Sequence, residues 1–142
     1  MADGFQDGKH TAAVFVDLQQ AYDHVWRQGL LFKMQTLGIQ GSMYNWIKYF
    51  LQDRTIATKL NSSISKKRSV VDGIPQGSAL SCTLFLIFIH DLPDCLNVQN
   101  AMFADDLVMC TDTKRLQNRL KQSLSNLSTY CEFWKLKINS QY

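Results

Sequence analysis

Acidic residues at the ends of apolar segments constrain the fold of this chain more than any other feature of its sequence. The segment TAAVFVD, residues 11–17, is an apolar run that ends at Asp17. Two further short apolar segments, residues 100–104 and 107–110, flank the pair Asp105 and Asp106. Compact apolar runs of this length predict buried strands, and the last two predict a hairpin whose turn carries both acids. A carboxylate that points inward without a partner is costly, and a bound cation can offset that cost.

Carboxylates from two neighbouring strands can share one cation, because such strands lie about 4.8 Å apart in a sheet. Consecutive strand residues point to opposite faces, so Asp105 and Asp106 cannot both face Asp17 unless the turn redirects one of them. We therefore expect one acid of the pair to be a firm ligand and the other to be peripheral. Carboxylate oxygens suit Mg²⁺, and two such ions about 4 Å apart promote phosphoryl transfer. The alternative interpretation of the dipeptide is an ordinary turn filler.

The composition restricts the classes of protein further. The chain has 142 residues, of which 46% are hydrophobic and 19% charged, which predicts one globular domain and excludes fibrous and disordered classes. Its net charge of +3 is compatible with nucleic acid but does not by itself indicate it. Of its 12 acidic residues only Glu132 is a glutamate, and aspartate is the acid typical of caps, turns and hard-metal sites.

The remaining sequence predicts helices and one further hairpin. Apolar periodicity and stop signals predict helices over residues 18–26, 29–37, 42–50, 78–90 and 116–134, the third of them capped by Ser42. Two β-rich segments, residues 55–60 and 68–71, flank a polar loop over 61–67 and predict a hairpin. Residues 73–77 form a loop, and residues 135–138 a last strand. Without a regular βαβ rhythm, this order predicts an α+β sandwich with helices on one sheet face.

Cysteine usage and hydropathy bear on the compartment. The cysteines are widely spaced among apolar residues, so we expect reduced core thiols of an intracellular protein and no zinc site; they are Cys82, Cys95, Cys110 and Cys131. Residues 1–10 are polar and do not resemble a signal peptide. The most apolar run, residues 79–89, is far shorter than the roughly 20 residues of a bilayer-spanning helix. It therefore predicts a buried core helix and no membrane partner.

Four segments resemble the motifs of one enzyme family. VFVDLQQAYD, residues 14–23, resembles the first catalytic motif of reverse transcriptases, and GIPQGSALS, residues 73–81, resembles the second. FADD, residues 103–106, resembles their aspartate-pair box, and YCEFWKLKIN, residues 130–139, is similar to the segment after it. Their order and spacing are similar to the palm of non-LTR (LINE-type, jockey-like) retrotransposon reverse transcriptases. The resemblance implies an α+β fold with a polymerase palm-like antiparallel sheet and helices packed on one face.

The resemblance implies a role for each acid. Asp17 and Asp105 match the metal ligands of the family, Asp106 stands beside them in the same catalytic constellation, and the Leu18 carbonyl oxygen is a further possible ligand. The implied cofactor is two Mg²⁺ ions, with Mn²⁺ as a substitute. The implied partners are an RNA template, a DNA primer and deoxynucleoside triphosphates.

Three other residues match nucleotide-binding positions of the family. Tyr22 matches an aromatic gate against the ribose 2′-hydroxyl; core packing is the alternative. Gln76 matches a residue near the template–nucleotide pair, where an amide can donate and accept; capping of the following helix is the alternative. Gly77, like Gly73, allows a positive φ or a close backbone approach. Asp23 also matches a frequent acid of the family, and we interpret it as structural.

Basic and aromatic residues carry weaker signals. The predicted hairpin carries Lys59, Lys66, Lys67 and Arg68, which are candidates for contact with template or primer phosphates, with a solvated hairpin tip as the alternative. The basic face of the helix over 116–134 has the same two interpretations. The tryptophans fall at apolar helical positions, which favours core packing over base stacking; they are Trp26, Trp46 and Trp134.

The chain departs from the family pattern at two positions and in extent. Phe103 stands where the family usually has Tyr, and Tyr142 stands where it tends to have Lys, a candidate proton donor to pyrophosphate. Residues 1–142 are expected to form a partial reverse transcriptase domain, the palm, with fingers, thumb and endonuclease absent.

Three hypotheses follow from these observations. In the first, the chain is the palm of an RNA-directed DNA polymerase that uses two metal ions to join deoxynucleotides to a primer 3′-hydroxyl. In the second, it is a truncated transposon-derived fragment that catalyses nothing and binds nucleic acid weakly. In the third, it is similar to another palm-type polymerase, such as a group II intron maturase or a telomerase.

Overall fold

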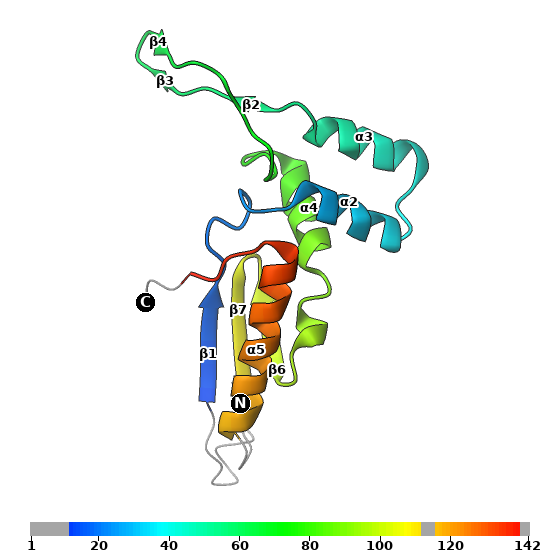
Figure 1. Cartoon of the computed structure of the whole chain (residues 1–142), viewed down its shortest axis with the longest axis vertical. Helices are drawn as coiled ribbons and strands as arrows, with labels where there is room; N and C mark the ends of the chain where they lie inside the picture. Colours follow the sequence, from blue (N-terminus) through cyan, green and yellow to red (C-terminus); the bar gives the residue numbers. More distant parts are fainter. Residues whose placement is uncertain (1–11, 112–115, 140–142) are drawn as a thin grey trace.

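A computed structural model describes residues 12–111 and 116–139, and its central element is a small antiparallel sheet (Figure 1). The strands are β1 (Ala12–Asp17), β6 (Gln99–Phe103) and β7 (Asp106–Thr111), in the order β1-β7-β6. The apolar alternation of these segments places one set of side chains inward, which is why they form half-buried strands. The strands expected from the acid-ended apolar runs are confirmed.

The two faces of the sheet differ in what covers them. The inward residues Leu107 and Met109 of β7 are buried, and α5 (Leu116–Trp134) packs against this strand. On the opposite face Phe15 and Phe103 are 78% and 83% exposed. The expected α+β palm-like fold with helices on one face of an antiparallel sheet is therefore confirmed.

Three more helices complete the core. They are α2 (Arg27–Thr36), α3 (Gly41–Leu51) and α4 (Ala79–Ile89), followed by the 3-10 turn η1 (Pro93–Cys95). Helix α2 packs on both α3 and α4. Helix α4 is apolar almost all round, as expected of a core helix, but it buries one face only, since Leu84, Phe85 and Phe88 are buried and Leu86 is 56% exposed. The core joins α4, β7 and α5 through Leu84, Phe85, Phe88, Leu107, Met109, Leu127 and Cys131.

A narrow double hairpin projects from the rest of the molecule (Figure 1). Strand β2 (Thr55–Ile56) pairs with β5 (Arg68–Ser69), and β3 (Lys59–Leu60) pairs with β4 (Ser63–Ile64). All four two-residue strands are exposed. The predicted hairpin is confirmed, except that its expected polar loop contains strand β4.

A buried cation ties α2 to α4 and α5. Lys33 is 2% exposed, and its ammonium group forms an ion pair with Asp91. It also donates to the Phe88 carbonyl at 2.6 Å and to the Tyr130 hydroxyl at 2.7 Å. The ammonium lies 3.8 Å from the ring centroid of Trp134. Every donor of the ammonium thus has a partner, which is the condition under which a buried charge is tolerated.

The helix expected over residues 18–26 is wrong. The chain forms successive turns there, and Gln20 has a φ of 45°, a left-handed conformation that does not continue a right-handed helix. The Gln19 N–H donates instead to the Lys137 carbonyl at 2.8 Å. The strand expected over residues 135–138 shrinks to one antiparallel bridge between Leu18 and Ile138.

Helix α3 buries a different stripe from the expected one. Gln40 rather than Ser42 is its N-cap, and Trp46 is 56% exposed instead of packed in the core. The buried residues are Ile47 and Leu51, because α3 contacts α2 along a narrow strip only. The core packing predicted for the other two tryptophans agrees better with the structure, because Trp134 is buried and Trp26 is half-buried.

The expectation of four core thiols is also wrong in part. All four cysteines are free, but Cys82 is exposed, Cys95 and Cys110 are half-buried, and Cys131 is buried. None of the helices in the described residues is long and apolar enough to cross a membrane.

Candidate functional site

The register of the sheet brings two of the predicted acids face to face. Asp17, the last residue of β1, is the direct partner of Asp106, the first residue of β7. Directly opposite residues of an antiparallel pair have Cβ atoms about 4.5–5.5 Å apart on the same face of the sheet. Both acids lie on the open face, which Phe15 shares because it is two residues before Asp17.

The third acid, Asp105, lies in the tight turn between β6 and β7. Ala104 has a φ of 51°, which allows a two-residue loop closed by the Phe103–Asp106 pair. The Asp105 carbonyl accepts a hydrogen bond from the Leu18 N–H at 3.3 Å. The turn thereby takes Asp105 out of the strand alternation and places its backbone beside the end of β1.

A residue that the sequence did not single out holds Asp17. The Asn139 side chain donates to Asp17 Oδ2 at 2.8 Å, and the Asn139 N–H donates to the Asp17 carbonyl at 2.9 Å. The Leu18–Ile138 bridge is formed by two main-chain hydrogen bonds, from the Gln19 N–H to the Lys137 carbonyl and from the Asn139 N–H to the Asp17 carbonyl. Neither of these bonds uses the Leu18 carbonyl oxygen, the further possible metal ligand. The sequence feature that could have pointed to Asn139 is its position at the end of the segment over residues 130–139, which resembles the family segment after the aspartate-pair box.

A groove of about 650 Å³ opens beside the Asp105 turn. It is bordered by the turns after β1, by the start of α4 and by the loop that precedes α4. Of the three acids, Asp105 lines this groove, whereas Asp17 and Asp106 lie at the adjoining sheet end. Tyr22, Gln76 and Gly77 line it as well. The structure therefore places one predicted metal ligand, Asp105, in the same groove as the three residues that the sequence assigned to nucleotide binding.

Tyr22 is fixed against helix α4 at one wall of the groove. Its ring stacks on Phe85 with centroids 4.9 Å apart and planes 16° apart. A hydrogen bond with the Cys82 side chain, aided by burial and by the negative charge of Asp105, raises the pKa of Tyr22. The ring is half-buried against the core, as the packing interpretation predicts, and it also lines the groove, where its role as a gate stays a prediction.

The loop over residues 73–77 docks on the turns after β1. Its main-chain N–H groups at Gly73 and Ile74 donate to the Val25 and Tyr22 carbonyls at 2.8 and 2.9 Å. Gly73 has a φ of +82°, and a Cβ there would lie 2.8 Å from the Asp23 carbonyl oxygen. This glycine is therefore required by a close backbone approach.

The Gln76 side chain does not cap helix α4. Its Nε2 atom donates to Asp23 Oδ1 at 3.0 Å, across 53 residues of sequence. Ser78 is the N-cap of α4 and makes no side-chain cap hydrogen bond. The capping alternative for Gln76 is therefore wrong.

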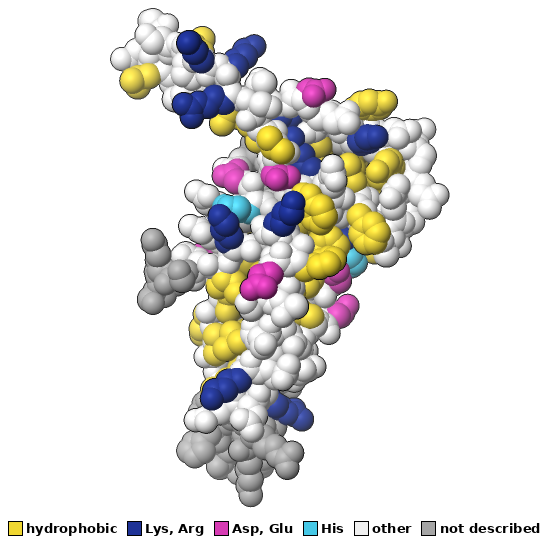
Figure 2. Space-filling model, in the orientation of Figure 1, with side chains coloured by type: hydrophobic (Ala, Val, Ile, Leu, Met, Phe, Trp, Pro, Cys, Tyr) yellow, Lys and Arg dark blue, Asp and Glu magenta, His cyan; other side chains and the backbone are white. Residues whose placement is uncertain are grey.

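The predicted basic residues lie apart from the groove. Lys66, Lys67 and Arg68 are exposed on the projecting double hairpin, where dark blue side chains gather in Figure 2. The residues that line the groove come from other segments. The structure thus leaves the basic hairpin as a separate charged surface.

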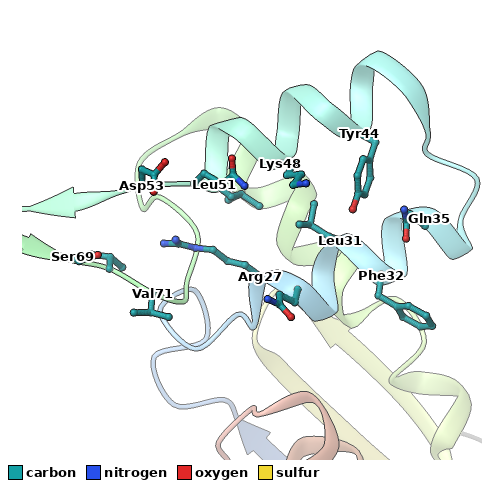
Figure 3. Close-up of a pocket in the computed structure, with 13 residues that line it drawn as sticks. Arg27, Leu31, Phe32, Gln35, Tyr44, Lys48, Leu51, Asp53, Ser69 and Val71 are labelled. Atoms are coloured by element: carbon teal, nitrogen blue, oxygen red, sulfur yellow. The ribbon is translucent and has the colours of Figure 1, made fainter.

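A second hollow, of about 550 Å³, lies between α2, α3 and the base of the hairpin (Figure 3). Arg27 extends toward it from α2 and is anchored by donation to the Gly73 carbonyl at 2.8 Å and the Asp72 carbonyl at 3.1 Å. Lys48 and Tyr44 line it from α3. Nothing in the sequence predicted this hollow, because three separate segments form it.

The side chains at the sheet end do not converge as a preformed cage. Within residues 12–111 and 116–139, no group of three or more His, Cys, Asp or Glu side chains is arranged to hold a metal ion. Tyr142, which the sequence placed at a family lysine position, lies outside the described residues.

Comparison with known proteins gives the context of this site. A model of the family described as reverse transcriptase (RNA-dependent DNA polymerase) matches residues 2–141. The chain is 34% identical over 152 residues to the probable RNA-directed DNA polymerase from transposon BS of Drosophila melanogaster. That match covers 96% of this chain and 16% of the relative. It is 30% identical over 150 residues to the RNA-directed DNA polymerase from mobile element jockey of the same species, covering 98% and 16%.

A solved structure shares the fold. It is a telomerase from Candida albicans, determined with a TWJ fragment of telomeric RNA, and it superposes with a TM-score of 0.63 at 14% identity. The match covers 98% of this chain and 28% of that chain. The chain thus spans about a sixth of the mobile-element polymerases that it matches. On the family match and these identities, the chain belongs to the reverse transcriptase family and is similar to the polymerases of non-LTR mobile elements.

Proposed function

We propose that this chain is the palm of an RNA-directed DNA polymerase, which joins deoxynucleotides to a primer 3′-hydroxyl on an RNA template. The observation that carries the proposal is the position of an acid pair beside the groove that Asp105 lines. Asp17 and Asp106 are paired across β1 and β7 at the sheet end, and Asp105, in the adjoining turn, lines the groove together with Tyr22 and Gln76.

The chemistry of the acids fits two Mg²⁺ ions, or Mn²⁺ in their place. Mg²⁺ takes few ligands from the protein, since it keeps waters and accepts oxygens from substrate phosphates. Two or three carboxylates at a sheet end, with the Leu18 carbonyl oxygen, are a donor set of this kind. When bound, such a pair of ions stabilises the attacking and leaving oxygens of a phosphoryl transfer. Asn139, by donating to Asp17 Oδ2, holds that carboxylate in orientation.

The groove supplies the proposed nucleotide contacts. The Tyr22 ring, immobilised on Phe85, would stand against a ribose 2′-hydroxyl and so select deoxynucleotides. The Gln76 amide would lie beside the base pair, and Gly77, with a φ of +83° and open space at its Cβ position, would let the nucleotide approach the backbone. Lys66, Lys67 and Arg68 would contact phosphates of the template or primer through the projecting hairpin.

Primer extension on an RNA template tests this proposal directly. We expect Mg²⁺-dependent incorporation of deoxynucleotides by the wild-type chain. The rate of incorporation should fall by about 10²-fold or more in Asp105→Ala, because a proposed metal ligand, and with it electrostatic stabilisation of the transition state, is lost. The matched control is Asp94→Ala, an exposed aspartate in η1 and away from the groove. Equal incorporation by wild type and Asp105→Ala would contradict catalysis at this site.

Metal binding is tested separately from activity. We expect Mn²⁺ or Mg²⁺ to raise the melting temperature of the wild-type chain, because a ligand bound only by the native state stabilises it. Asp17→Ala should lose this shift and Asp94→Ala should keep it. A metal shift that is the same in all three proteins would contradict a site at Asp17. The second hypothesis, an inactive fragment, predicts no incorporation by any variant.

A further inference from the structure

The turns after β1 and the loop before α4 are linked by one bond between side chains. Gln76 Nε2 donates to Asp23 Oδ1 at 3.0 Å, and both residues are exposed. The bond lies outside the core, since neither Asp23 nor Gln76 belongs to the buried cluster that contains Val25 and Ile74. Its role must therefore be sought at the surface, where Gln76 meets the groove.

The chemistry of the pair fixes the orientation of the amide. A Gln side chain presents a carbonyl oxygen on one edge and an NH₂ group on the other, and either edge can face a partner. An ionised carboxylate only accepts hydrogen bonds, so Asp23 selects the NH₂ edge. One N–H is thereby used, and the Oε1 acceptor together with the second N–H is left for a ligand.

The position of the pair gives this orientation a consequence. Gln76 lines both the groove with Tyr22 and Asp105 and a second groove of about 560 Å³ that contains Arg54 and Asp72. Asp23 lines the second groove and not the first. Gln76 thus borders both hollows, whereas Asp23, to which its side chain donates, borders only the second.

Hydrogen bonds join the two backbone segments that carry the pair. Gly73 N–H and Ile74 N–H donate to carbonyls of the segment that carries Asp23, and the Cβ position of Gly73 lies 3.0 Å from Asp23 Cα. The Ser81 hydroxyl donates to the Pro75 carbonyl from helix α4. Because both backbones are fixed to each other, the distance between Asp23 and Gln76 is fixed too.

We propose that Asp23 is a positioning residue for nucleotide recognition, which presents the Gln76 carbonyl oxygen and its free N–H to the deoxynucleotide in the groove. This inference rests on the proposed function, because it assumes that the groove takes a nucleotide. It assigns to Asp23 an action through Gln76 and no contact of its own with the reacting atoms.

The experiment has two readouts on the wild-type chain, Asp23→Asn, Gln76→Ala and the double variant. Asn has the shape of Asp but can turn either a donor or an acceptor to Gln76, so it removes the selection without removing the side chain. The first readout is the nuclear magnetic resonance signal of the Gln76 side-chain NH₂ group. The second is the dissociation constant of dATP in the presence of an RNA template and a chain-terminated DNA primer, so that binding is measured without catalysis.

We expect Asp23→Asn to shift the Gln76 NH₂ resonances and to weaken dATP binding about fivefold, the equivalent of one net hydrogen bond. Gln76→Ala should weaken dATP binding by at least as much. The double variant should bind dATP no more weakly than Gln76→Ala does. Asp94→Asn, an exposed aspartate outside both grooves, should change neither readout.

The outcomes separate this inference from the proposed function. Unchanged Gln76 resonances in Asp23→Asn, or unchanged dATP affinity, would overturn the positioning role and leave the polymerase proposal standing. Additive losses in the double variant would also overturn it, because Asp23 would then act independently of Gln76. Weakened dATP binding in Asp23→Asn, together with no primer extension by wild type, would support the positioning role and contradict the activity. No dATP binding by wild type would overturn both.

Discussion

Lys33 is the residue whose environment differs most from what its type predicts. Lysine is rarely buried, yet Lys33 sits among aromatic rings with Asp91 and the Tyr130 hydroxyl as partners. Burial lowers the pKa of Lys33, and the nearby Asp91 carboxylate opposes that effect. Burial and the hydrogen bond to Asp91 raise the pKa of Tyr130. These groups form one hydrogen-bonded unit that locks α2 onto α4 and α5.

Acid is expected to weaken this unit. Burial raises the pKa of Asp91, but the hydrogen bonds from Lys33 and Tyr130 together lower it by more. The pKa of Asp91 therefore lies below the ordinary value of 3.8. A carboxyl group whose folded pKa is depressed stabilises the fold above its unfolded pKa, and that stability is lost as pH falls through the folded pKa. The contribution should therefore be complete at pH 6 and decline below pH 3.8.

Denaturant unfolding of wild type and Asp91→Asn as a function of pH measures this contribution. At pH 6 we expect Asp91→Asn to lower the free energy of unfolding by about 2 kcal/mol. That is less than for a fully buried pair, because the Asp91 side chain is 35% exposed. The difference should shrink below pH 3.8. The control Asp94→Asn should change the free energy of unfolding by less than about 0.5 kcal/mol. A difference that is constant from pH 6 to pH 3 would contradict this account.

At the scale of elements, α3 illustrates why periodicity misjudges a peripheral helix. The apolar residues Met43, Trp46, Ile47 and Phe50 recur at helical spacing, and this spacing correctly predicted that a helix would form. It could not say how wide the buried strip is, since that depends on how many neighbours the helix has. Helix α3 has one principal neighbour, α2, and Met43 and Trp46 are left 58% and 56% exposed.

Adjacent residues of α3 provide a matched test of this arrangement. Ile47 is 4% exposed, so Ile47→Ala should lower the free energy of unfolding by about 2–4 kcal/mol through lost burial and a cavity. Trp46→Ala removes a larger side chain but should lower it by about 1 kcal/mol at most, the value of the stacked pair that Trp46 makes with Phe50. Urea denaturation of the two variants gives the comparison. A larger loss in Trp46→Ala than in Ile47→Ala would mean that α3 packs by the other face.

In the molecule as a whole, the acids of the sheet end and the cations of the double hairpin lie apart. Asp17 and Asp106 are paired at the sheet end and Asp105 lines the groove beside it, whereas exposed cations lie on the hairpin that projects from the core (Figures 1 and 2). If the chain binds nucleic acid as proposed, the phosphates are repelled by the acidic sheet end. The proposed phosphate contacts of the basic hairpin would offset that repulsion and would be non-specific.

Salt dependence of RNA binding tests the hairpin. The triple variant Lys66→Gln, Lys67→Gln, Arg68→Gln should bind single-stranded RNA more weakly, with a loss that is similar for different sequences. The slope of log affinity against log salt should fall in magnitude by about two, because each phosphate contact to a single strand contributes about 0.7. The control Arg119→Gln, Lys121→Gln removes exposed cations of α5 and should leave the slope near its wild-type value. Equal slopes in wild type and the triple variant would exclude the hairpin from the interface.

Local patterns in the sequence correctly predicted the strands of the central sheet, the helices α2, α3, α4 and α5, and the family. Alternation, helical spacing and turn residues act over a few neighbouring positions, so they can be read from a linear sequence. The motifs around Asp17, Gly73 and Asp105 indicated the family for the same reason, and the family match confirms it. The helix expected over residues 18–26 failed because a main-chain bond from Gln19 to Lys137, far along the chain, outweighed local preference.

The tertiary structure alone decided which groups meet. Asp106 rather than Asp105 lies opposite Asp17 because the register of β1 on β7 fixes it. Asp23 meets Gln76 across 53 residues, Lys33 meets Asp91 across 58, and Asn139 meets Asp17 across 122. Such contacts arise from the order in which sheet and helices pack, and no local pattern encodes a distance of that length. The palm-like arrangement of strands and helices can thus be predicted from the sequence, whereas the orientation of each carboxylate and amide depends on long-range packing.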